Sequence, residues 1–200
     1  MRKTVTIAAT LLSILTLSAC GNTSSKSSST SSDSEKTEQK KTEKNTITLT
    51  KYNKIKVGNS LTGAGGTDEK VVKSMYGKPE SKSETAVPGA SKKGTSYSWS
   101  NVGTSLKGAA VTTEFLDGKT VAKGYTNFES SPEVTNAKYK SIKLGQSYIS
   151  VKHKLGTPIT ESIAGSGTTS AQTLTYSNGT KSIVLIFTNN KLSSKTFSEL

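Results

Sequence analysis

The feature that most restricts the fold of this 200-residue chain is an internal repeat. Residues 51–60 align with residues 138–147, and six of the ten positions are identical. Further along, three residues match at a spacing of 79, with Val72, Gly77 and Pro79 corresponding to Val151, Gly156 and Pro158. Two matches indicate the duplication of one structural unit, not a long repeat array. We place the two copies at residues 46–133 and 134–200.

Each copy begins with a pattern that predicts two short helices. A tyrosine and an isoleucine three residues apart, followed by glycine, indicate the first helix of each pair. Ser147 is a suitable N-cap for a second helix over residues 148–155, and Gly156 follows its last turn. In the first copy, Thr67 is the corresponding N-cap for a helix over residues 68–76.

After each helix pair the hydrophobic period changes to two, which is typical of strands. Residues 95–100 alternate serine with tyrosine and tryptophan. Further β-rich segments cover residues 109–116, 121–125, 183–187 and 192–197. Asp117-Gly118 and Asn189-Asn190 are strong hairpin turns between them. The sequence therefore predicts an α+β fold, a tandem repeat of a helix pair plus a three- or four-stranded antiparallel sheet.

The first 20 residues have the pattern of an export signal. A basic start precedes a mostly apolar segment over residues 4–17, which is shorter than the 20 or so apolar residues that a spanning helix needs. The following Leu17-Ser18-Ala19-Cys20 resembles the bacterial lipobox, whose cysteine becomes a diacylglyceryl cysteine carrying fatty chains such as palmitate. We expect residues 1–19 to be a lipoprotein signal peptide and lipidated Cys20 to anchor the chain on the extracytoplasmic side of the cell membrane. The alternative is an unmodified thiol within a spanning anchor.

The segment that follows is expected to be a disordered tether. Residues 21–45 are rich in serine and lysine and contain no aliphatic or aromatic residue. Such a segment cannot bury enough apolar surface to offset the entropy lost on folding. Together with Cys20 it forms a spacer over residues 20–45, with a root-mean-square reach of roughly 25–30 Å.

The charge of the remaining chain restricts its partners. Residues 46–200 contain 20 lysines, no arginine and 10 acidic residues. Reading bases or phosphates in a bidentate manner favours arginine, so we expect no nucleic-acid partner. The positive field favours anionic lipid or the polyanions of a cell envelope. The alternative is that these charges serve solubility alone.

Composition and motifs give no indication of catalysis. One cysteine excludes an internal disulfide, one histidine excludes a histidine-rich metal cluster, and the mean hydropathy of −0.45 excludes an integral membrane protein.

His153 lies between two lysines with no acidic residue nearby in sequence. The glycine-rich residues 63–67 lack the lysine of a phosphate-binding loop and are interpreted as a flexible loop. The isolated acidic residues Glu80, Glu84, Glu114 and Asp117 are interpreted as solvated. We predict no enzyme activity, no cofactor and no metal.

The spacing in the second copy carries a family resemblance. Ile-x-x-Gly-x-Ser-x-x-x-Val-x-x-x-Leu-Gly-x-Pro, from Ile142 to Pro158, resembles the signature of the β-lactamase-inhibitor-protein-like superfamily, which the SmpA/OmlA (BamE) lipoproteins share. Two copies behind a lipobox are similar to Gram-positive lipoproteins with a tandem inhibitor-like domain. The resemblance implies that the sheets join into one concave surface, which in the inhibitor binds an enzyme through aromatic and polar contacts. The inhibitor joins its repeats by disulfides, which this chain cannot form.

Aromatic side chains are the candidate partner contacts, because tyrosine and tryptophan dominate the energetics of interfaces. The candidates are Tyr97, Trp99, Tyr125, Tyr148 and Tyr176. The alternative is that these rings pack beneath the helices, which the serines alternating with the first two favour. The expected function is a lipid-anchored, non-enzymatic module that binds a protein partner through its sheet face. The alternative is a polycationic structural or assembly lipoprotein that holds anionic polymers or a membrane complex.

Overall fold

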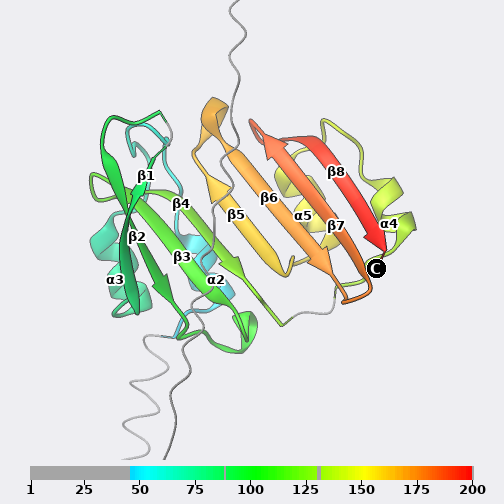
Figure 1. The fold of residues 1–200 in the computed structure, drawn as a ribbon, viewed down its shortest axis with the longest axis horizontal. Coiled ribbons are helices and arrows are strands. Elements are labelled where there is room, and N and C mark those ends of the chain that lie inside the picture. The colour runs from blue at the N-terminus through cyan, green and yellow to red at the C-terminus, as the bar shows by residue number, and fades with distance from the viewer. Residues whose placement is uncertain (1–45, 88, 130–131, 200) are drawn as a thin grey trace, which may run out of the picture.

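A computed structural model describes residues 46–87, 89–129 and 132–199 of the chain (Figure 1). The expected signal peptide, Cys20 and the tether before residue 46 lie outside the described residues. The helices are α2 (Leu49–Lys54), α3 (Glu69–Tyr76), α4 (Asn136–Ser141) and α5 (Tyr148–Leu155), with short 3-10 turns at Thr104–Leu106 and Gly167–Thr169. The strands are β1 (Ser81–Ala86), β2 (Lys93–Trp99), β3 (Ala110–Leu116), β4 (Lys119–Thr126), β5 (Thr160–Ala164), β6 (Ala171–Ser177), β7 (Lys181–Thr188) and β8 (Lys191–Glu199).

One sheet dominates the molecule. Its eight strands are antiparallel and lie side by side in chain order. β4 pairs with β5, with Lys123 opposite Ile163 and Tyr125 opposite Glu161, so the ladder continues between the two halves. The predicted α+β tandem of helix pairs with small sheets is therefore wrong. The helices have only six or eight residues, and the fold is sheet-dominated because strand pairing does not stop at the boundary of the repeat.

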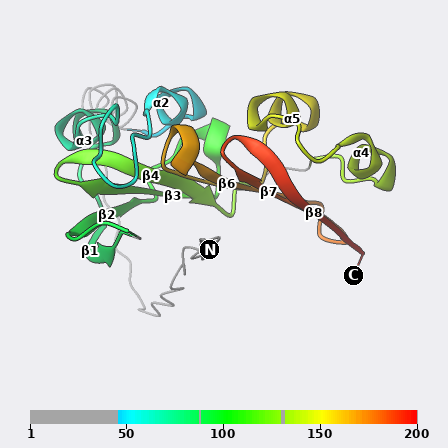
Figure 2. The ribbon, with the colours of Figure 1, turned by 90° about the horizontal axis from the view of Figure 1, so that it is seen from above.

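All four helices of the described region lie on one face of the sheet, which bends away from them (Figure 2). Two cores fill the space between the layers. The first packs rings such as Tyr52, Tyr76 and Trp99 beneath α2 and α3, and the second packs side chains such as Leu174 and Phe187 beneath α4 and α5. Both cores draw all their members from residues 47–197, so residues 46–200 contain the hydrophobic core that independent folding requires.

Of the two predicted N-caps, Ser147 is confirmed and Thr67 is wrong. The Ser147 hydroxyl accepts a hydrogen bond from the backbone N–H of Ser150, which confirms it as the N-cap of α5. The N-cap of α3 is Asp68, not Thr67. The Thr67 hydroxyl instead accepts from the backbone N–H of Lys56, at 2.8 Å, and so fixes the loop that leads into α3.

The two predicted hairpin turns are confirmed. Asp117 and Gly118 have φ angles of 48° and 73°, and Asn189 and Asn190 have φ angles of 53° and 58°. Positive φ at both central residues matches the right-handed twist of paired strands, which is why these residue types favour such turns. They join β3 to β4 and β7 to β8.

Candidate functional site

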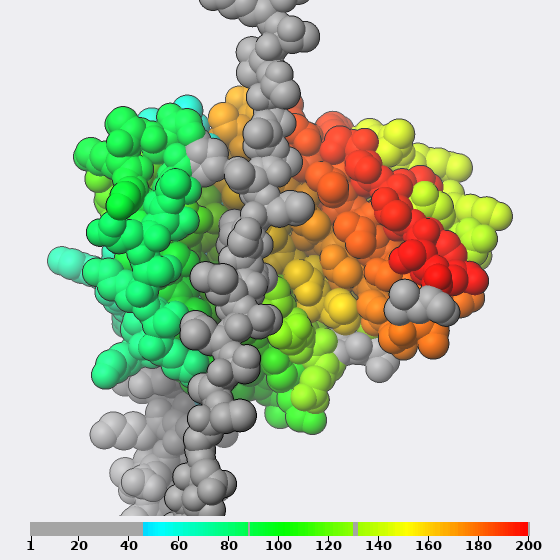
Figure 3. Space-filling model, in the orientation of Figure 1, coloured from blue at the N-terminus to red at the C-terminus, as the bar shows by residue number. Residues whose placement is uncertain are grey.

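The first candidate site is the sheet face that carries no helix, here called the open face. Successive residues of a strand point to opposite faces, so the register assigns each side chain. One row crosses all eight strands on the open face and consists of Ser81, Ser98, Thr112, Gly124, Ser162, Thr173, Ile186 and Ser194. We call it the hydroxyl row, because six of its members carry hydroxyl groups. Figure 3 views the molecule from this side and shows strands of both halves contributing to it.

The open face is almost free of charge. Away from the strand ends, Glu114 is the one ionisable side chain that the register of the described strands places there, opposite Ser96 and Ala122. Glu114 is 9% exposed, and burial raises the pKa of its carboxyl group. The strand lysines Lys123 and Lys195 point to the helix side, where their ammonium groups contact helix ends. The open face therefore presents small hydroxyl groups for contact, not an electrostatic field.

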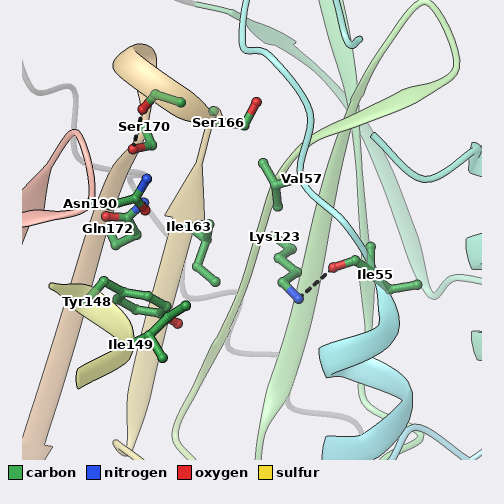
Figure 4. Close-up of a pocket in the computed structure, with 12 residues that line it drawn as sticks. Ile55, Val57, Lys123, Tyr148, Ile149, Ile163, Ser166, Ser170, Gln172 and Asn190 are labelled. Carbon is green, nitrogen blue, oxygen red and sulfur yellow. Dashed lines mark hydrogen bonds between the residues drawn. The ribbon is translucent and has the colours of Figure 1, made fainter. Parts of the chain in front are cut away.

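The second candidate is a cleft on the helix side, between α2 and α5, with a volume of about 270 Å³. Apolar side chains of both halves line it, among them Ile55, Val57, Ile149 and Ile163. Figure 4 shows Ile163 between residues of the first half and residues of the second. The Lys123 Nζ atom donates to the backbone oxygens of Tyr52 and Ile55, at 2.8 Å each.

Lys123 caps a helix, as does Lys195, the residue at the equivalent position in the second half. At a spacing of 72, the Lys195 Nζ atom donates to the backbone oxygens of Tyr139 and Ile142, at 3.0 and 2.7 Å. Each ammonium group thus caps the end of the first helix of its half. Burial lowers the pKa of Lys123 to about 8 and lowers the pKa of Lys195 as well. The lysine in the cleft is therefore a helix cap, with no nucleophilic role indicated.

The capping lysine predicts a pH dependence of stability. Between the folded-state pKa of about 8 and the ordinary value of 10.5, the unfolded chain binds more protons at Lys123, so the free energy of unfolding rises with pH. We expect Lys123 to contribute a rise of about 1 kcal/mol from pH 8 to 9 in urea denaturation of residues 46–200. Toward pH 10 the trend reverses, because burial raises the pKa of five tyrosines, Tyr76 among them, and these residues ionise first in the unfolded chain. An equal rise in a Lys123→Met variant would contradict this assignment.

A buried ionic cluster attaches α5 to the sheet next to the cleft. The Lys152 Nζ atom lies 2.5 Å from the Glu161 Oε1 atom, and the Tyr148 hydroxyl donates to the same oxygen. The Glu161 side chain is fully buried, and its Oε2 atom has no hydrogen-bond partner in the described part of the chain. Burial, followed by the Glu161 charge, raises the pKa of Tyr148 far above its ordinary value. The cluster fixes the position of a helix and contains no histidine, serine or cysteine that could act as a nucleophile.

The structure places most of the predicted contact residues inside the cores. Tyr97, Trp99, Tyr125 and Tyr176 are buried, and Tyr148 is half-buried. Their polar atoms bond inward; for example, Trp99 Nε1 donates to the Gly77 oxygen and the Tyr176 hydroxyl donates to the Gly156 oxygen. The burial of these rings supports the alternative of core packing, and their contact with a partner stays a prediction. None of the five lies on the open face.

Sequence reasoning missed the hydroxyl row and the Lys152–Glu161 pair. The alternation of serine with tyrosine and tryptophan in β2 indicated one polar face, but only the register extends this face across eight strands. Among the described residues, no group of three or more histidine, cysteine, aspartate or glutamate side chains could hold a metal ion. In the same region no helix has the length and apolar character that crossing a membrane requires.

The described residues form one layer of helices behind a continuous sheet. The other face of this sheet is open and nearly uncharged, so the chain is a β-sheet protein with one sheet face that can contact another molecule. The chain belongs to the family described as "Domain of Unknown Function with solved-structure structure (DUF3862)", which matches residues 43–200. It is similar to the crystal structure of a "putative beta-lactamase inhibitor protein" from Streptococcus mutans, with 26% identity and a TM-score of 0.62. The similarity covers 74% of this chain and 93% of the other. A comparison with curated proteins found no match.

Proposed function

We propose that this chain is a non-enzymatic protein-binding module, held on the outer side of the cell membrane by a lipid on Cys20, that contacts its partner through the open face. The observation that carries the proposal is the hydroxyl row, which runs over all eight strands without a charged member. The similarity to an inhibitor-like protein supports a binding role without catalysis. The lipobox sequence Leu17-Ser18-Ala19-Cys20 supports the anchor.

The open face is suited to a protein partner for two physical reasons. Its serine and threonine side chains lose little conformational entropy on burial, and their hydroxyl groups can donate or accept hydrogen bonds. Its neutrality avoids the cost of desolvating unpaired charges when an interface closes. The sheet bends toward this side, so a convex partner surface meets several strands at once (Figure 2).

The test uses paired arginine substitutions in the middle of the hydroxyl row. Tagged residues 46–200 are used to isolate a partner from an envelope extract, and its affinity is then measured by titration. Ser162→Arg with Thr173→Arg should weaken binding at least tenfold, because two bulky unpaired charges enter the interface. The matched control is Asn53→Arg on α2 with Ser150→Arg on α5, which also adds two positive charges; both residues are exposed, and binding should change less than twofold.

Two outcomes would overturn the proposal. Equal binding by the Ser162→Arg, Thr173→Arg variant and the control would remove the open face as the contact surface. Turnover of a cell-wall or phosphoester substrate by residues 46–200 would remove the non-enzymatic assignment. The anchor is tested in whole cells by fractionation, where the full chain should be found with membranes and a Cys20→Ala variant should not.

A further inference from the structure

Exposed lysines without acidic partners gather on the helix side of the molecule. The helices, the loops within each helix pair and the segment before α4 contain four acidic residues outside the core, and each has a lysine: Glu69 pairs with Lys73, Asp68 with Lys119, Glu129 with Lys107 and Glu133 with Lys138, at 2.6–2.9 Å. Six further exposed lysines of these segments have no acidic residue within ion-pair distance in the described chain, namely Lys54, Lys56, Lys70, Lys140, Lys143 and Lys154. The helix side therefore has a net positive surface.

The exposed large apolar side chains belong to the same helices and loops. In the described residues there are four, and none lies in a strand. Val71 on α3 is 46% exposed and follows Lys70, and Leu144 before α5 is 63% exposed and follows Lys143. Ile149 on α5 is 76% exposed, and Leu61 between α2 and α3 is 45% exposed. Exposed apolar side chains thus lie among the lysines of α3, α5 and the loops of the helix layer, and this layer covers one side of the sheet (Figure 2).

We infer that this helix layer binds the surface of an anionic lipid bilayer. Lysines near such a surface are attracted to its headgroups, each by about fivefold in affinity, while isolated apolar side chains enter the boundary with the acyl chains. A soluble polyanion would account for the lysines only, because it offers no apolar phase to Ile149 and Leu144. The open face then points away from the membrane. This inference depends neither on the proposed partner nor on lipidation of Cys20.

The experiment is cosedimentation of residues 46–200 with vesicles of phosphatidylcholine alone or with 30% phosphatidylglycerol added. We expect binding to the anionic vesicles only, and a steep loss of binding as salt screens the charges. A helix-side variant that combines Lys54→Gln, Lys56→Gln, Lys140→Gln and Lys143→Gln should bind at least tenfold more weakly. Ile149→Ser with Leu144→Ser should also weaken binding, without any change in charge.

The matched control changes the net charge equally on the other side. Replacing the exposed Ser83, Ser194, Thr196 and Ser198 of β1 and β8 by glutamate adds four negative charges and so also lowers the net charge by four, and vesicle binding should change less than threefold. Equal losses in the two charge variants would show that only the total charge matters and would overturn the inference. Equal binding to neutral and anionic vesicles would overturn it too. So would binding to polyphosphate without binding to vesicles, because the partner would then be a soluble polyanion.

Discussion

Replacing Trp99 by alanine is expected to lower the free energy of unfolding of residues 46–200 by about 3–5 kcal/mol. Trp99 is 1% exposed, and its ring meets the Tyr76 ring edge to face at a centroid distance of 5.3 Å. Its Nε1 atom donates to the Gly77 oxygen at 3.1 Å, which ties β2 to the end of α3. Alanine leaves a cavity and removes this bond. Because Trp99 is the sole tryptophan, urea denaturation should be followed by circular dichroism.

Two variants separate packing from the other roles of this residue. Trp99→Phe keeps a ring but loses the hydrogen bond to Gly77, so we expect a smaller loss of about 1–2 kcal/mol. Ser98→Ala changes the neighbouring residue on the open face and should alter stability by less than about 0.5 kcal/mol. A stable Trp99→Ala protein that has lost its partner would contradict the core assignment and identify Trp99 as a contact residue.

The parts of the fold that the sequence predicts are those with local signals. Ser147 and Gly156 mark the ends of α5 because capping depends on residues within one turn. Asn189-Asn190 marks the β7–β8 hairpin because few residue types tolerate positive φ at two successive positions. The aromatic and serine alternation of β2 places Trp99 and Ser98 on opposite faces for the same reason, since a strand has a period of two.

The parts that the sequence does not predict depend on pairing between distant segments. β1 has the sequence SKSETA, and every one of its residues is exposed or half-exposed, so it lacks the hydrophobic alternation of a strand. β5 has the sequence TESIA, and it forms because β4 and β6 supply partners on both sides. The pairing of β4 with β5 joins the strands of both copies into one sheet, which the family resemblance implied. No local pattern encodes it.

The candidate site is hidden from sequence reasoning for a similar reason. The hydroxyl row takes one residue from each strand, and its members are separated by loops of different length, so only the register aligns Ser81 with Ser194. Aromatic residues are common at protein interfaces, which is why they were the predicted contact residues, yet in this structure most of them are buried in the cores. The structure extends the similarity of the two copies to positions with equal roles, as Lys123 and Lys195 show. The same correspondence provides the control for the next experiment.

Replacing Lys152 by methionine is expected to destabilise residues 46–200 by about 3–5 kcal/mol, because it leaves the Glu161 carboxylate buried without its cation. The Glu161 side chain has no exposed surface, whereas Lys152 retains 22%. Once Lys152 is removed, the described residues leave the carboxylate with only the Tyr148 hydroxyl as a hydrogen-bond partner. The measurement is again urea denaturation followed by circular dichroism.

Lys73 is the matched control, since it occupies the position of Lys152 at a spacing of 79. It pairs with Glu69 at 2.6 Å, but the two side chains are 38% and 25% exposed, so Lys73→Met should cost about 1 kcal/mol or less. Lys152→Met combined with Glu161→Leu should recover most of the loss, because an apolar pair needs no counterion. Equal losses for Lys73→Met and Lys152→Met would mean that burial does not set the strength of these pairs. A double variant as unstable as Lys152→Met would show that Lys152 acts through its contacts with α5 and not through the charge of Glu161.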